Sequence, residues 1–164
     1  MHVEVLEEID YQKILDEANT IKVQLNRGWG TLGQVGIQGH KPDLDANVEW
    51  QSSIGRGDRL QYPETYFKYH LFNVPTINRI MDKYGMLRTR LMQSDPKSCL
   101  TMHQDMSKRI HIPLITNPDC VMIIEDRTYY LEPGKIYLTN TTLRHTAVNA
   151  SDRARVHIVG CIYS

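Results

Sequence analysis

The stretch Arg109–Asn140, RIHIPLITNPDCVMIIEDRTYYLEPGKIYLTN, decides the fold class of this chain. Apolar and β-branched runs alternate in it with three turn signals, Asn117-Pro118-Asp119, Asp126-Arg127 and Pro133-Gly134. Short runs bounded by such turns predict β-strands. The same rhythm extends outward in both directions. We therefore expect strands over residues 86–93, 99–103, 109–116, 121–125, 128–131, 135–140, 146–149 and 155–163.

Strands that recur about every eight to twelve residues are typical of a β-sandwich or a β-barrel. No long helical pattern separates them, which excludes a parallel sheet built from strand–helix–strand units. The chain has 164 residues, a common size for one domain. We expect a single domain over 1–164, with a helical and irregular part over 1–85 and a β core over 86–164.

Two helices are expected before the β core. Apolar residues recur at helical spacing over 6–18, which predicts a short amphipathic helix. The second is expected over 74–84, where Pro75 lies near the first turn and Gly85 follows the last residue. Short strands are also candidates over 21–25 and 46–52.

The glycine-rich zone between these helices contains two motifs that we set aside. Gly28–Gly33 spells GxGxxG, but a dinucleotide site needs a helix directly afterwards. Two further glycines and Pro42 follow instead, so we expect a loop. Arg56-Gly57-Asp58 is interpreted as a turn. The wider segment Gly55–Tyr69 is rich in Arg, Tyr and Gly and is a candidate substrate loop.

Composition excludes several classes of protein. Lys and Arg total 19, as do Asp and Glu, so the net charge is zero. This argues against nucleic-acid binding and against a polybasic membrane anchor. No apolar run is long enough to cross a bilayer, and the acidic N-terminus does not resemble a secretory signal. Three distant cysteines suit reduced thiols, which predicts a cytoplasmic location. The oligomeric state is left open.

Two strands carry the same pattern of side chains. Arg109-Ile-His111-Ile and Arg155-Val-His157-Ile each place Arg and His on one face and aliphatic residues on the other. Such a polar face can point to solvent, or it can line a wet cavity inside a barrel. A single strand of this kind more often turns its polar face to solvent, but the repetition of the pattern makes the cavity a hypothesis to pursue.

A possible metal site follows from three residues. His103-Gln-Asp105 is an HxD motif, and His145 lies forty residues downstream, beyond several strands. Two histidines and one carboxylate form the facial triad of non-haem Fe(II) oxygenases. Arg155 follows ten residues after His145 and is placed to bind the far carboxylate of a dicarboxylate co-substrate. Arg109 and His111 offer further donors.

These segments resemble a known family. The runs 103–114, 144–149 and 155–158 are similar to the aspartyl/asparaginyl β-hydroxylase-like branch of the Fe(II)/2-oxoglutarate-dependent oxygenases, which also includes proline hydroxylases. The resemblance covers about residues 86–160. It implies a double-stranded β-helix, which is a cupin-like jelly roll. It also implies Fe(II) held by His103, Asp105 and His145, the distal carboxylate of 2-oxoglutarate on Arg155, and Arg109 and His111 near its chelating end.

The implied activity is hydroxylation of an amino acid or peptide side chain with O2, coupled to conversion of 2-oxoglutarate to succinate. The sequence departs from the mammalian peptide hydroxylases of this branch, which lack the carboxylate ligand kept here at Asp105. That carboxylate also disfavours a halogenase. The position of the family's small hydroxyl residue falls near Met92. A metal- or small-acid-binding cupin-type module without turnover is the alternative, and the arginines near the metal favour the enzyme.

Overall fold

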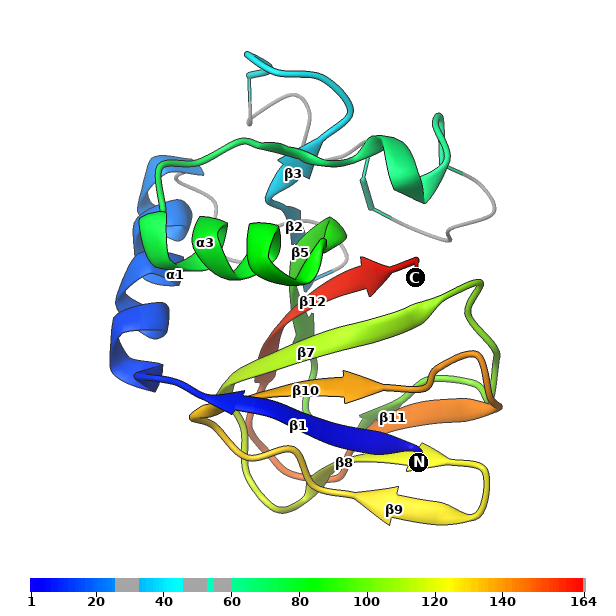
Figure 1. The fold of residues 1–164 in the computed structure, drawn as a ribbon. Coiled ribbons are helices and arrows are strands. Elements are labelled where there is room, and N and C mark those ends of the chain that lie inside the picture. The colour runs from blue at the N-terminus through cyan, green and yellow to red at the C-terminus, as the bar shows by residue number, and fades with distance from the viewer. Residues whose placement is uncertain (26–32, 46–52, 55–59, 164) are drawn as a thin grey trace.

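The computed structural model describes residues 1–25, 33–45, 53–54 and 60–163. Its strands form two larger antiparallel sheets (Figure 1). The first sheet has the order β1 (Val3–Glu8), β10 (Lys135–Thr139), β7 (Lys108–Ile115), β12 (Arg155–Ile162), β5 (Leu87–Ser94), β2 (Gln34–Gly36). The second sheet has the order β6 (Ser98–Cys99), β11 (His145–Asn149), β8 (Cys120–Ile124), β9 (Arg127–Tyr129).

The chain passes back and forth between these two sheets. β5, β7, β10 and β12 belong to the first, whereas β6, β8, β9 and β11 belong to the second. This winding is the double-stranded β-helix, or jelly roll, that the family resemblance implied. The eight strands expected from residue 86 onward are all present, although the strand expected over 99–103 is reduced to Ser98–Cys99 and an isolated bridge at His103.

Helices α1 (Tyr11–Leu25) and α3 (Pro75–Tyr84) lie beside the first sheet (Figure 1). Their buried residues share a core with Ile110, Ile112 and Leu114, which project from one face of β7. Arg109 and His111 alternate with these residues and therefore lie on the opposite face. The alternation expected from the sequence thus separates an apolar outer face, covered by the helices, from a polar inner face.

The end of α3 is specified locally, whereas its start is capped by a residue of α1. The left-handed Gly85, with φ of 63°, ends the helix, and its N–H is bonded to the carbonyls of Met81 and Asp82. At the start, the Glu17 carboxylate from α1 accepts hydrogen bonds from the N–H groups of Thr76 and Ile77, at 3.1 and 3.0 Å. The helix predicted over 74–84 is confirmed.

The helix predicted over 6–18 was wrong in its first part. Residues Val3–Glu8 form β1 and pair with β10, so Leu6 belongs to a strand. The helix begins at Tyr11 and continues to Leu25, through the segment that was a candidate strand. Pairing with an available sheet edge outweighed the local helical periodicity. Asp10 accepts a hydrogen bond from the N–H of Lys13, as a residue before a first turn does.

The remaining elements lie near the first sheet. Strands β3 (Gln38–Gly39) and β4 (Tyr69–His70) pair with each other, and Glu64–Tyr66 forms a short 3-10 helix, η3. After Gly33 the chain enters β2, not the helix that a dinucleotide site requires. The strand expected over 46–52 and the turn at 56–58 lie outside the described residues. No helix in the described ranges is long and apolar enough to span a membrane.

Candidate metal centre

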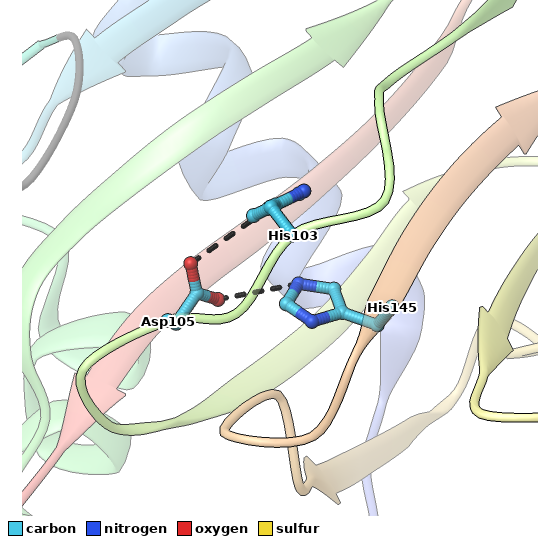
Figure 2. A group of neighbouring side chains, drawn as sticks. All are labelled: His103, Asp105 and His145. Atoms are coloured by element: carbon cyan, nitrogen blue, oxygen red, sulfur yellow. Dashed lines mark ion pairs between the residues drawn. The ribbon is translucent and has the colours of Figure 1, made fainter.

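The side chains of His103, Asp105 and His145 converge on one point (Figure 2). Their candidate ligand atoms all lie within 4.8 Å of one another. The Nε2 atom of His103 lies 3.8 Å from one oxygen of Asp105, and the Nε2 atom of His145 lies 3.4 Å from the other. The HxD motif and the distant histidine are therefore brought together, as the sequence predicted.

Backbone hydrogen bonds set this arrangement. The N–H of His103 donates to the carbonyl of His145 at 2.9 Å, and the N–H of His145 donates to the carbonyl of His103 at 2.9 Å. The N–H of Asp105 donates to the carbonyl of Thr141, also at 2.9 Å. The strand expected over 99–103 therefore does not extend as far as the HxD motif. The motif lies in the β6–β7 connection, which is bonded to the start of β11 and the residues before it.

The hydrogen bonds of the imidazoles determine which nitrogen faces the centre. The Nδ1 atom of His103 lies 2.7 Å from the carbonyl oxygen of Thr101, and that of His145 lies 2.9 Å from the carbonyl oxygen of Leu143. A carbonyl oxygen can only accept, so each Nδ1 carries the proton. In the neutral ring, each Nε2 then has a free lone pair facing Asp105. This is the tautomer that a metal-binding histidine needs.

The electrostatics keep Asp105 ionised. Burial alone would raise the pKa of its carboxyl group, but the hydrogen bond from His145 and the positive charge of Arg109 lower it to about 2. The Nε atom of Arg109 lies 3.5 Å from the carboxylate. Burial lowers the pKa of His145, and the hydrogen bond to Asp105 outweighs this and raises it. The Asp105 carboxylate is therefore charged and can bind a cation together with the two imidazoles.

A cavity of about 710 Å³ opens beside this cluster, between the two sheets. Its lining includes the three clustered residues together with Arg109, His111 and Arg155, so the polar faces of β7 and β12 line a cavity and do not face solvent. Arg155 lies on the first sheet and His145 on the second. Arg155 therefore lies across the barrel from His145 and is not its neighbour within one sheet.

Two buried histidines lie deeper on the same wall. The Nδ1 atoms of His111 and His157 are 3.0 Å apart, so one donates a proton and the other accepts it. Burial, assisted by the positive charge of Arg155, lowers the pKa of His111 to about 3 and that of His157 well below its ordinary value. Both rings are neutral near pH 7 and can offer hydrogen bonds without adding charge.

The sequence analysis missed an acidic residue that binds two of the arginines lining the cavity. Glu64, fully buried in η3, lies 2.6 Å from Arg88 and 3.2 Å from Arg109. It also accepts a hydrogen bond from the hydroxyl of Tyr163 at 2.6 Å. Glu64 occurs in an irregular segment, where no periodicity identifies inward-facing residues.

Arg88 and Arg90 were missed as well, although the sequence contained a signal for them. They occur two residues apart in a correctly predicted strand and therefore favour the same face. Both line the cavity. In the proposed substrate loop, Tyr62 stacks on His40 with ring centres 4.1 Å apart, and neither Tyr62 nor Tyr66 is part of the described lining of the cavity. Arg56 and Arg59 lie outside the described residues.

Fold and site together define a cupin-like jelly roll with a His-Asp-His cluster at an arginine-lined cavity. The family model of aspartyl/asparaginyl β-hydroxylase matches residues 8–162. The chain belongs to this family, which confirms the resemblance noted in the sequence.

Individual relatives are more distant. L-proline cis-4-hydroxylase of Rhizobium meliloti (strain 1021) is 24% identical over 97 residues, which are 53% of this chain and 35% of that protein. The chain thus spans about a third of the length of this curated relative. The non-heme monooxygenase ThoJ, in a nickel complex, has a TM-score of 0.52 at 10% identity and covers 96% of this chain and 71% of its own. A 2OG-Fe(II) oxygenase family protein of Burkholderia pseudomallei is 15% identical, with a TM-score of 0.46 over 56% of this chain and 58% of its own.

Proposed function

We propose that this protein is a non-haem Fe(II)- and 2-oxoglutarate-dependent dioxygenase that hydroxylates an amino acid or a peptide side chain. One observation carries the proposal. Two imidazoles with protonated Nδ1 atoms turn their Nε2 lone pairs toward one ionised carboxylate, with all three ligand atoms within 4.8 Å. Membership of a hydroxylase family supports it.

The donor set fits Fe(II). Two imidazole nitrogens and one carboxylate oxygen make the facial triad, which leaves positions open for a co-substrate and O2. His103, Asp105 and His145 would hold the ion, and when bound it would activate O2 for the oxidation of a C–H bond. The carbonyls of Thr101 and Leu143 fix the two imidazole orientations. The low pKa of Asp105 keeps the carboxylate charged for the cation.

The cavity wall fits an oxo-diacid. The Arg155 side chain is buried, its Nε has no hydrogen-bond partner among the described residues, and it lines the cavity. We assign it to the distal carboxylate of 2-oxoglutarate. Arg109 and His111 line the same cavity, and Arg109 lies beside Asp105. We assign both to the end of 2-oxoglutarate that chelates the metal, where decarboxylation yields succinate.

The partners that follow are O2 and a small molecule or peptide. L-proline, the substrate named for the Rhizobium relative, is therefore the first compound to test. The proposed partners include neither nucleic acid nor a membrane surface, because the chain has no net positive charge to attract them. The three free cysteines fit a reducing compartment, and we include a cytoplasmic location in the proposal.

Anaerobic mixing of the protein with Fe(II) and 2-oxoglutarate tests the proposal. We expect a visible charge-transfer band from the chelated complex and, in air, succinate release that depends on an added amino acid or peptide. His103→Ala should lose both. The matched control His70→Ala, which removes an exposed histidine paired with Asp82, should keep them. Absence of the band and of succinate would overturn the proposal, and a band without succinate for any substrate would favour the non-catalytic binding module.

A further inference from the structure

Four arginines are buried on the inner wall of the described cavity. Arg88, Arg90, Arg109 and Arg155 are exposed by 1, 5, 6 and 6%. All four line the same cavity. A buried cation is costly unless an anion or several hydrogen bonds compensate it. The partners of each guanidinium therefore indicate which arginines serve the fold and which await a ligand.

Two of the four are compensated by the protein. Arg88 and Arg109 both contact the Glu64 carboxylate, at 2.6 and 3.2 Å. Arg109 also lies 3.5 Å from Asp105. Two acidic side chains approach this wall among the described residues, and both are already engaged. Glu64 contacts the two arginines, and Asp105 belongs to the His-Asp-His group.

Arg90 has no acidic partner in the described part of the chain. One of its terminal nitrogens donates to the side-chain oxygen of Gln34 at 2.9 Å, and its Nε has no hydrogen-bond partner among the residues that the structure describes. Burial, together with the nearby charge of Arg88, lowers the pKa of Arg90 to about 9. Arg90 is still a cation at neutral pH, and its side chain lines a cavity large enough for a small molecule.

The position of Arg90 separates it from Arg155. In the register of β12 and β5, Arg90 pairs with Val159, whereas Arg155 pairs with Ser94. Val159 lies four residues along β12 from Arg155, which places the two arginine backbones about 13 Å apart at the usual rise of a strand. The two guanidiniums are therefore mounted at different points on the wall, and each can hold its own anion.

The rest of the cavity supplies apolar surface. Leu100, Met106, Met122 and Ala147 line it, and the first two are 55 and 58% exposed. Exposed apolar side chains near a buried cation suit a ligand that has both a hydrocarbon part and a negative group.

We infer that Arg90, assisted by Gln34, forms a second anion site that binds the carboxylate of the substrate. The substrate is then a small free carboxylic acid with an apolar body, such as a free amino acid, and not an internal residue of a peptide. That the bound acid is the substrate rests on the proposed function, whereas the carboxylate site itself rests on the contacts of Arg90 alone.

Matched acids and amides test this site. Binding is measured by calorimetry without O2, in the presence of Fe(II) and saturating 2-oxoglutarate, for free apolar L-amino acids and their amides, beginning with L-proline and L-prolinamide. We expect at least one acid to bind about tenfold or more tightly than its amide. Arg90→Gln should weaken binding of the acid by about 10- to 100-fold, the size of a lost hydrogen bond to a charged group. Binding of the amide should not change.

Two controls accompany this variant. Arg127→Gln removes an exposed arginine from β9 and should bind the acid like the wild type. Arg90→Lys keeps the charge without the planar fork and should bind the acid between the wild type and Arg90→Gln, which serves if the Gln variant folds poorly.

Several results would overturn the inference. One is equal binding of every acid and its amide, and another is unchanged binding of the acid by Arg90→Gln. A third is loss of the 2-oxoglutarate charge-transfer band in Arg90→Gln, because this loss would assign Arg90 to the co-substrate. Failure of the proposed function is distinguishable, because a wild type that forms no band can still be titrated as apo-protein. Carboxylate-dependent binding that requires Arg90 would then support the anion site alone.

Discussion

The two pairs of buried arginines on the cavity wall differ in what compensates their charge. Arg88 and Arg109 share the carboxylate of Glu64, a residue of the N-terminal part that reaches the β core. Arg90 and Arg155 are as deeply buried, but within the described residues neither has an acidic partner. The first pair joins the two parts of the chain, whereas the second pair is the one that we propose to bind anionic ligands. Burial alone would not have separated these roles.

The largest test of this comparison removes the negative charge of Glu64. Glu64→Gln leaves Arg88 and Arg109 buried without their carboxylate, and breaking such a pair costs about 3–5 kcal/mol. We expect a loss of this size in the free energy of unfolding, measured by urea denaturation at neutral pH. Arg155→Gln, which breaks no ion pair among the described residues, should change the stability by less than about 1 kcal/mol. Equal losses in the two variants would remove the distinction between the pairs.

A second prediction concerns the ligand side of the comparison. Arg155→Gln should weaken 2-oxoglutarate by about 100-fold, because a bidentate, charge-assisted contact is lost. Affinity for Fe(II) should stay nearly unchanged, because Arg155 is absent from the ion pairs with Asp105. Titration of the charge-transfer band with each component separates the two affinities. A parallel loss of both would mean that Arg155 supports the fold and does not bind the co-substrate.

The smallest effect is a pH dependence. Burial would raise the pKa of Glu64, but the charge of Arg109 and hydrogen bonds from Tyr163 and Arg88 lower it below its ordinary 4.5. Between the lower pKa of the folded state and the ordinary pKa of the unfolded state, the unfolded state binds the proton more readily. The stability that Glu64 contributes is therefore complete above about pH 4.5 and is lost as the pH falls through the folded value.

The measurement is a comparison of unfolding curves. The difference in stability between the wild type and Glu64→Gln should narrow as the pH falls from about 7 to about 3. A difference that stays constant over this range would show that the charge of Glu64 is not what stabilises the wall.

Much of the β core could be predicted because its signals are local. Turn residues such as Pro133-Gly134 bound each strand, and the alternation of Arg109 and His111 with isoleucines identifies two faces. In the same way, Pro75 and Gly85 mark the start and the end of α3. The N-terminal strand could not be found in this way. Val3–Glu8 has a pattern that also fits a helix, and only the free edge of β10 determines its conformation.

By itself, the sequence determined the alternation of strands and turns, the separation of a polar and an apolar strand face, and the spacing of His103, Asp105 and His145. These depend on neighbours within a few residues or on a pattern of repeated strands. The tertiary structure alone decided that Arg88 and Arg109 share the Glu64 carboxylate, and that Arg90 has no carboxylate partner among the described residues. The physical reason is that charge compensation in a buried cavity depends on distance in space, and Glu64 reaches Arg109 across 45 residues of sequence.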